Sequence, residues 1–282
     1  MVSGPVADRR RLAADLRRFR SASGRTVEDV ARYLECSPAK VSRMETGVVK
    51  VGVQDLRALL ELYDIDGPAR EELLARARES RRRGWWQEFA DLVPPGSARF
   101  YGLEDAAVTI AQHSASLVPG LLQTRGYAAA LIGSVPGIDA PLADQRVELR
   151  MRRQRLLDRG VAPRLHVVLD EAVLCRRVGG SAVLAEQLRH LLVVAQRPTV
   201  TMQVVEFTAA THPAVGVSFT VFELDGATGT DRVVFREQLD ANSFVEHPDQ
   251  VAIYTTALTA AAGAAASPER SHEIVRKHLA RL

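Results

Sequence analysis

Two helix signals near the N-terminus stand only about three residues apart, and this spacing constrains the fold more than any other feature of the chain. Thr26 is a good N-cap, and Glu28 and Asp29 suit the positive end of the helix that follows it. After this helix, Ser37 is a second N-cap, and Pro38 fits a first helical position, where its missing N–H costs nothing. Two helices joined by so short a turn are typical of a helix-turn-helix.

The rest of residues 9–83 also consists almost entirely of helix signals. Leu12, Leu16 and Phe19 recur at helical spacing in a first helix that ends near 21–24. Further helices are predicted around 53–63 and 68–82. We therefore expect an all-α domain over 9–83, preceded by a disordered N-terminus over 1–8.

The excess of basic over acidic residues lies in this N-terminal part of the chain. Residues 1–83 contain 18 Lys and Arg against 13 Asp and Glu, a net charge of +5, whereas residues 84–282 hold 19 against 21, a net charge of −2. A positive small domain beside a near-neutral larger one indicates an anionic partner for the first domain, nucleic acid above all. Solvated arginine-rich helix faces would produce the same balance.

The pattern changes after Gly84, where Trp85 and Trp86 precede a Pro-Pro-Gly sequence, and we expect a second domain over 84–282. Its predicted helices lie near 103–115, 124–132, 141–159 and 181–196, with more helix in the last ~35 residues. Its predicted strands are rich in β-branched residues and lie at 164–169, 200–207, 217–224 and 231–237. A strand, a helix and a second strand suggest one parallel pair, and the later strands suit a hairpin. The fold class expected is therefore multidomain, an all-α domain followed by a mixed α/β or α+β domain.

The first domain resembles a known family. Thr26-Val27-Glu28-Asp29-Val30-Ala31, followed by Cys36-Ser37-Pro38-Ala39-Lys40-Val41-Ser42-Arg43-Met44-Glu45-Thr46-Gly47, is similar to the Cro/CI-type (XRE) helix-turn-helix. This resemblance implies a lambda-repressor-like DNA-binding domain with its recognition helix in the major groove. In one departure from the family, Val27 stands where Gln usually follows the capping Thr.

The recognition helix has one face for the core and one for DNA. Val41 and Met44 share the inward face, whereas Ala39 and Arg43, four residues apart, share the outward one. Arg43 can donate two hydrogen bonds to guanine O6 and N7, and Ala39 can contact a thymine methyl. Lys50 follows where related domains contact a phosphate. The candidate DNA-binding residues are Thr26, Ser37, Pro38, Ala39, Lys40, Ser42, Arg43 and Lys50.

The resemblance also implies an ion pair within this domain. Arg20 and Glu45 are the counterparts of residues that join the first helix to the end of the third in similar domains. As a partly exposed pair, they should contribute about 0.5 to 1 kcal/mol.

The second domain resembles the C-terminal domain of the Scr-type antitoxin-like regulators. The most specific string is Val118-Pro119-Gly120-Leu121-Leu122-Gln123-Thr124, and Arg152-Arg153-Gln154 and Leu169-Asp170-Glu171-Ala172-Val173-Leu174 are also similar. Residues 118–124 form either a docking patch or a buried turn. Arg146, Arg150 and Arg153 lie on one face of the helix at 141–159, which is either a solvated face or a clamp for DNA or an acidic partner.

Catalytic and metal-binding signatures are missing from the sequence. Cys36 and Cys175 are far apart without a CxxC, His113, His166, His190 and His212 are scattered, and no P-loop, GxGxxG, GxSxG or HExxH occurs. We expect no enzyme activity, no cofactor and no metal. No apolar run reaches the ~18 residues that a membrane span needs, so we expect a cytoplasmic, nucleoid-associated protein.

These observations together predict a sequence-specific DNA-binding transcriptional regulator. We expect a homodimer on double-stranded DNA with an inverted-repeat operator, because one such domain buries too little surface for high affinity. The second domain would then supply dimerisation and effector or partner sensing. The alternative is an antitoxin-like protein that binds a small partner protein and autoregulates its operon.

Overall fold

A computed structural model describes residues 4–81, 84–93, 97–226, 229–238 and 242–282. The chain divides into two compact units. The first contains residues up to Gln87 together with the segments Gly102–Ala107 and Leu224–Asp231, and the second holds the remainder. Within the described ranges, no helix combines the length and apolarity needed to cross a membrane.

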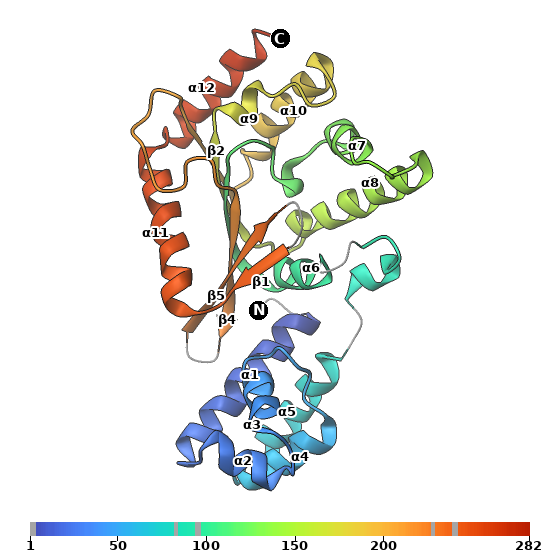
Figure 1. Ribbon diagram of the computed structural model, residues 1–282, viewed down its shortest axis with the longest axis vertical. Helices are drawn as coiled ribbons and strands as arrows, with labels where there is room; N and C mark the ends of the chain where they lie inside the picture. The colour runs from blue at the N-terminus through green and yellow to red at the C-terminus, as the bar shows by residue number, and fades with distance from the viewer. Residues whose placement is uncertain (1–3, 82–83, 94–96, 227–228, 239–241) are drawn as a thin grey trace. The chain divides into compact units, whose positions relative to one another are not determined.

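The first unit contains five helices around one hydrophobic core (Figure 1). They are α1 (Pro5–Ala22), α2 (Val27–Tyr33), α3 (Pro38–Glu45), α4 (Val53–Leu62) and α5 (Gly67–Glu79). Residues at helical spacing supply the core, whose most buried members include Leu12, Leu16, Val30, Val41, Met44, Leu56 and Leu60. The order and spacing of helices predicted from the sequence are confirmed for this unit.

The N-terminus differs from the prediction of disorder over 1–8. Helix α1 begins at Pro5, so the helix includes four of these eight residues; residues 1–3 lie outside the described part of the chain. Proline in the first turn has a suitable φ and lacks only an N–H that would have no intrahelical partner there. The prediction was wrong because the first helix was recognised from the apolar spacing of Leu12, Leu16 and Phe19, which does not mark where the helix begins.

Helices α1 to α4 all end in the same hydrogen-bonded turn. At the end of α2, the Cys36 N–H donates to the Ala31 carbonyl at 2.9 Å and the Glu35 N–H to the Arg32 carbonyl at 3.3 Å, which is a Schellman motif. The motif needs one left-handed residue at each helix end. These residues are Gly24, Glu35, Gly47 and Asp64, with φ between 50° and 69°.

Glu35→Gly should therefore stabilise the protein. A non-glycine residue in the left-handed region costs about 1 to 2 kcal/mol, and the substitution removes this cost. Glycine loses more conformational entropy than glutamate on folding, which cancels part of the gain, so the expected net stabilisation is about 0.5 to 1 kcal/mol. Urea unfolding of the full chain measures it. Gly24→Ala is the matched control, because no atom lies within 4 Å of the added methyl and only the backbone conformation is penalised. A loss of stability in Glu35→Gly would contradict the assignment of strain to this residue.

A six-stranded mixed sheet lies mostly in the second unit; the end of β4 and the start of β5 fall in the segment Leu224–Asp231 of the first. The strands are β1 (Ala107–Ser114), β2 (Arg164–Asp170), β3 (Val200–Val205), β4 (Phe219–Gly226), β5 (Gly229–Glu237) and β6 (Asn242–Val245), in the spatial order β3-β2-β1-β4-β5-β6. Strands β1, β2 and β3 are parallel, with Ile110 beside Leu165 and Leu165 beside Val200. Strands β5 and β6 are antiparallel. The predicted parallel pair is thus confirmed as β2 and β3, and the predicted hairpin strands are the neighbours β4 and β5.

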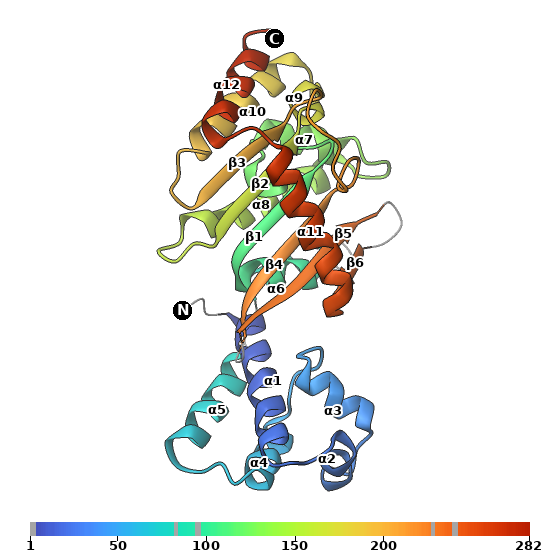
Figure 2. The same ribbon diagram turned by 90° about the vertical axis from the view of Figure 1, so that its left-hand side faces the viewer.

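Helices cover both faces of this sheet. They are α6 (Ser97–Ala106), α7 (Arg125–Gly133), α8 (Ala140–Gln154), α9 (Ala172–Cys175), α10 (Ser181–Val194), α11 (Pro248–Ala264) and α12 (Pro268–Leu279), with short 3-10 helices at Gly120–Leu122 and Arg155–Asp158. A further 3-10 helix, Trp85–Phe89, lies where the chain passes from the first unit to the second. Figures 1 and 2 both place α11 on one face of the sheet and α6 and α8 on the opposite face. The chain is therefore a multidomain α/β protein.

The helix predicted at 103–115 is wrong from residue 107 onward. Helix α6 ends at Ala106, and β1 begins at the next residue. Leu103, Ala106 and Ile110 have helical spacing, but a short apolar run suits a buried strand equally well. Pairing with β2 decides the matter, because it places Ile110 in the interior of the sheet, where the side chain is 1% exposed.

Candidate nucleic-acid interface

Helix α3 is positioned by its cap and its two core residues. The Ser37 hydroxyl accepts a hydrogen bond from the Lys40 N–H at 3.2 Å, and Pro38 occupies the first helical position. Val41 and Met44 are 2% and 1% exposed and pack in the core of the first unit. The capped, anchored helix therefore presents its other face to solvent, as the sequence predicts.

The exposed face of α3 contains Ala39, Ser42 and Arg43. The Arg43 Nε–H donates to the Ala39 carbonyl at 3.2 Å, so the side chain lies along its own helix. The backbone of Arg43 is held by the turn after α3, because its carbonyl accepts from the Val48 and Val49 N–H groups at 3.0 and 3.1 Å. A rotation of the side chain alone would bring this guanidinium away from the helix and into solvent.

Thr26 acts as a cap at the start of α2. Its hydroxyl accepts from the Asp29 N–H at 3.1 Å, and its own N–H donates to the Asp29 carboxylate at 3.0 Å, which completes a capping box. These hydrogen bonds from Thr26 lower the pKa of Asp29. The next residue, Val27, is partly buried against the core of this unit. The Thr26 side chain caps α2 and is nevertheless exposed, so it lies at the surface beside the Asp29 carboxylate.

The two lysines of the candidate interface differ in their partners. Lys40 Nζ lies 2.9 Å from the Asp55 Oδ2 of α4, and this contact raises the pKa of Lys40. Lys50 lies beyond α3 with an exposed side chain. Asp55 therefore offsets the charge of Lys40. The sequence reasoning missed this partner, because the two residues are brought together only by packing of α3 and α4.

The predicted ion pair between Arg20 and Glu45 is confirmed, and it is more buried than expected. Arg20 Nε lies 2.7 Å from one Glu45 carboxylate oxygen and Nη2 lies 2.9 Å from the other. The side chains are only 16% and 7% exposed. A hydrogen bond from Arg20 Nη1 to the Arg25 carbonyl at 3.0 Å extends the contact to the turn between α1 and α2. The pair therefore ties the end of α3 to α1 and helps to position α3.

In the second unit, residues 118–124 form a buried turn, and the docking-patch interpretation is wrong. Val118, Leu121 and Leu122 are between 1% and 4% exposed. The Gln187 side chain accepts from the Thr124 N–H and donates to the Leu122 carbonyl, both at 2.7 Å. Amide side chains thus satisfy the backbone of a turn that belongs to neither a regular helix nor the sheet.

Two of the three arginines predicted to share a face of α8, Arg150 and Arg153, contact the protein itself, so this face is not wholly solvated. Arg150 is partly buried and donates to the Gln123 side chain at 2.7 Å. The Arg153 guanidinium lies over the rings of Phe100 and Tyr101, with 5.0 and 5.7 Å to the ring centroids. Helical periodicity placed these arginines on one face, but it could not show that this face is directed toward the sheet.

The carboxylates after β2 have structural partners. Asp170 accepts from the Ala172 N–H at 2.8 Å at the start of α9. Glu171 contacts His278 Nε2 at 2.8 Å and accepts from the Phe207 N–H at 2.8 Å. His113 is fully buried, and burial lowers its pKa. Glu171 therefore joins distant segments of the second unit, whereas the Asp170 contact is local.

Comparison with known proteins gives one match for each part of the chain. A family profile described as a helix-turn-helix domain matches residues 11–73, which include the whole of α2, α3 and α4. A DNA-binding, transcription-regulating role therefore has support in this domain. No curated protein and no solved structure matches the chain.

A second profile, for a domain of unknown function, matches residues 97–277. The match spans more than half of the sequence, so the chain belongs to the family of the domain of unknown function DUF5753.

Proposed function

We propose that this protein is a sequence-specific transcriptional regulator that inserts α3 into the major groove of double-stranded DNA. The observation that carries the proposal is the division of α3 into a buried face, with Val41 and Met44, and an exposed face, with Ala39 and Arg43. A second helix docked at a short turn holds this exposed face outward, which is the geometry of a helix-turn-helix reader.

The exposed residues divide by chemistry into base contacts and phosphate contacts. Arg43 offers the planar fork that pairs with guanine O6 and N7, and Ala39 offers a methyl contact. Ser37, Ser42 and Thr26 bear hydroxyls suited to phosphate oxygens. Pro38 donates no hydrogen bond, so it can add only an apolar contact. Lys50 contributes a solvated charge, whereas the charge of Lys40 is shared with Asp55.

We further propose that the protein acts as a homodimer on an inverted-repeat operator. Two-fold symmetry places the recognition helices about 34 Å apart, one turn of DNA. Two copies of α3 double the contacted surface and supply the affinity that a single domain of this size lacks. The second unit provides dimerisation and effector sensing in this proposal. Sedimentation of the full chain with and without operator DNA tests the stoichiometry.

Arg43→Ala should weaken operator binding by about 1 to 3 kcal/mol, roughly 5- to 150-fold, with little change on scrambled DNA. The reason is that a bidentate base contact is lost, which discriminates among sequences. The operator is first obtained by selection from random DNA with the full chain, and both DNAs are then titrated at several salt concentrations. Equal losses on both DNAs would remove Arg43 from the reading face.

Lys50→Ala is the matched contrast, since it removes a charge and no base contact. It should weaken both DNAs alike and reduce the slope of log K against log salt by about one. Arg276→Ala, an exposed change on α12, should alter neither affinity nor slope. A sequence-dependent loss in Lys50→Ala would place this residue on a base rather than on a phosphate.

An antitoxin-like role is the second candidate, and the strings 118–124, 152–154 and 169–174 favour it through their similarity to the Scr-type regulators. In that case, the second unit sequesters a small partner protein and DNA binding serves autoregulation. Co-expression with the product of a neighbouring small gene, followed by gel filtration, separates the two roles. A stable complex with that product supports the antitoxin role.

A further inference from the structure

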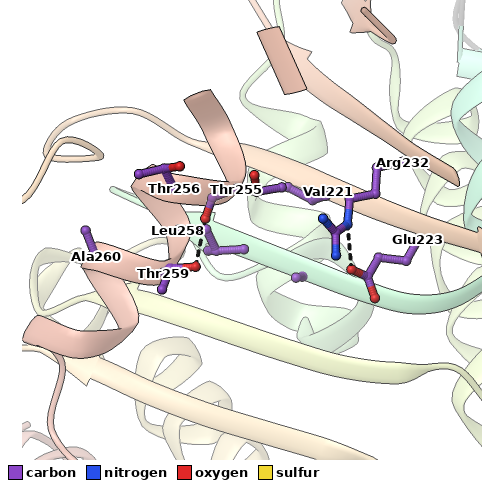
Figure 3. Close-up of a pocket in the computed structure, with 9 residues that line it drawn as sticks. Val221, Glu223, Arg232, Thr255, Thr256, Leu258, Thr259 and Ala260 are labelled. Atoms are coloured by element: carbon purple, nitrogen blue, oxygen red, sulfur yellow. Dashed lines mark hydrogen bonds and ion pairs between the residues drawn. The ribbon is translucent and has the colours of Figure 1, made fainter. Parts of the chain in front are cut away.

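The cavity between α11 and strands β1, β4 and β5 offers few free groups to a ligand (Figure 3). Its volume is about 550 Å³, but its charged groups already pair with each other, because Arg232 Nε lies 2.8 Å from Glu223 Oε1. The Thr259 hydroxyl donates to the Thr255 carbonyl at 2.9 Å. Side chains that satisfy one another leave little for a ligand to recognise.

A thiol, an imidazole and a carboxylate lie together at the carboxyl end of β2. Glu171 directly follows β2, Cys175 is the last residue of α9, and His278 belongs to α12, 103 residues beyond Cys175 in the chain. Cys175 Sγ lies 3.7 Å from His278 Nδ1, and His278 Nε2 lies 2.8 Å from Glu171 Oε1. Contacts between α9 and α12 thus bring a nucleophile, a base and an acid group into one row.

The carboxylate determines which nitrogen of His278 carries the proton. An ionised carboxylate can only accept hydrogen bonds, so His278 Nε2 donates to Glu171. The neutral imidazole then has its lone pair on Nδ1, which is the atom that faces the thiol. Glu171 is itself held in place, because its second oxygen accepts a hydrogen bond from the Phe207 N–H at 2.8 Å. His278 is therefore oriented as a base toward Cys175 before any reagent arrives.

Exposure differs between the two ends of this row. Cys175 is exposed to solvent, whereas the side chains of His278 and Glu171 are only 11% and 17% exposed. A small reagent can therefore reach the sulfur without entering a cavity. The imidazole and the carboxylate have less contact with water, which strengthens the hydrogen bond between them.

The thiol needs a base in order to react. Desolvation of the sulfur and the Glu171 carboxylate raise the pKa of Cys175. The charge of Asp170 adds to this shift in pKa, and the charge of Arg281 opposes it. The thiolate is the nucleophilic form of cysteine, and a raised pKa makes it scarce at neutral pH. Transfer of the thiol proton to His278 Nδ1 supplies the thiolate at the moment of attack, and Glu171 stabilises the imidazolium that forms.

We propose that Cys175 is a redox-modification site, at which hydrogen peroxide oxidises the thiol to a sulfenic acid with His278 as proton acceptor and donor. Sγ attacks one peroxide oxygen, so that an S–O bond forms as the O–O bond breaks; the sulfur is oxidised and the peroxide is reduced. The thiol proton passes to His278 Nδ1 and then to the leaving hydroxide, which departs as water. The modification goes beyond the proposed function in transcription and does not depend on it.

Hydrogen peroxide suits this site better than a disulfide reagent. Hydroxide is a much poorer leaving group than a thiolate, so its departure benefits more from a proton donor. His278 carries such a proton once it has deprotonated the thiol. The row of Cys175, His278 and Glu171 therefore assists both the attack and the departure.

The test is the rate of sulfenic acid formation in the full chain treated with hydrogen peroxide, with dimedone as the trap and peptide mass spectrometry as the readout. Cys36 is the internal reference, because its Sγ lies 3.7 Å from the Ser37 carbonyl, an acceptor that cannot remove the thiol proton. Near neutral pH, Cys175 should react at least about tenfold faster than Cys36.

His278→Gln should slow the oxidation of Cys175 at least about tenfold near neutral pH, because a positioned base is lost. The variant then depends on thiolate that forms without a base, so its rate should rise with pH and approach that of the unaltered chain at about pH 10. His272→Gln makes the same change elsewhere on α12 and should leave the rate unchanged. Circular dichroism at each pH verifies that the variants are folded.

His278→Ala provides a second, independent readout. Free imidazole added to this variant should restore part of the rate at Cys175, because it replaces the missing base in solution. It should not accelerate the reaction of the unaltered chain. Restoration of this kind distinguishes proton transfer from a structural role of His278.

Three outcomes would overturn the proposal. The first is equal oxidation of Cys175 and Cys36 in the unaltered chain near neutral pH, a comparison that needs no variant. The second is an unchanged rate in folded His278→Gln. The third is slowing by the same factor at every pH, without rescue of His278→Ala by imidazole, which would assign His278 a purely structural role.

Discussion

Gln187→Leu should lower the free energy of unfolding of the second unit by about 2 to 6 kcal/mol, because it leaves two buried backbone groups without partners at about 1 to 3 kcal/mol each. The Gln187 side chain is 0% exposed and bridges the Thr124 N–H and the Leu122 carbonyl at 2.7 Å. Leucine has nearly the same volume, so the effect reports lost hydrogen bonds more than a cavity. Urea unfolding of the full chain, followed by circular dichroism, measures the change.

Gln196→Leu is the control for this experiment. Gln196 is exposed just after α10, so the same chemical change should alter the free energy of unfolding by no more than about 0.5 kcal/mol. If Gln187→Leu were equally mild, water or a rearranged turn would be satisfying the freed backbone groups. The turn at 118–124 would then not depend on Gln187 for its backbone hydrogen bonds.

Arg20→Ala should destabilise the first unit by about 3 to 5 kcal/mol, the cost of leaving the partner of a buried ion pair uncompensated. The Glu45 carboxylate is only 7% exposed and receives two hydrogen bonds from Arg20 at 2.7 and 2.9 Å. This is well above the value of about 0.5 to 1 kcal/mol expected for a partly exposed pair. Unfolding of the first unit is followed by the fluorescence of Trp85 and Trp86.

A double-mutant cycle with Glu45→Ala isolates the interaction. The coupling energy should be about 1 to 3 kcal/mol, because the two residues contact each other directly. Arg270→Ala provides the surface comparison, since Arg270 pairs with Glu273 and both side chains are more than half exposed. It should leave the unfolding midpoint unchanged. Additive losses for Arg20→Ala and Glu45→Ala would mean that the pair contributes nothing beyond its separate side chains.

Prediction from the sequence succeeded where the chemistry is local. Thr26 and Ser37 define helix starts through hydrogen bonds to residues one turn away, and Pro38 does so through its fixed φ, so their roles follow from residue type and spacing. Val41 and Met44 follow from helical periodicity in the same way. The helix order of the first unit and the exposed position of Arg43 could therefore be predicted without coordinates.

Prediction failed where contacts between segments that are distant along the chain determine the structure. Residues 107–114 have an apolar pattern compatible with a helix, and pairing with β2 and β4, both more than fifty residues away, makes them a strand. Asp55 reaches Lys40 only through the packing of α4 against α3. No local pattern contains either contact.

The arginines of α8 show the same division. Residue type and helical spacing placed Arg150 and Arg153 on one face of a helix, and this much was confirmed. Whether that face meets solvent, DNA or the protein itself depends on how α8 packs on the sheet. This packing is determined by many contacts between segments that are distant along the chain. Local hydrogen bonding and periodicity thus settled which residues share a face, whereas long-range packing decided that both arginines contact the protein itself.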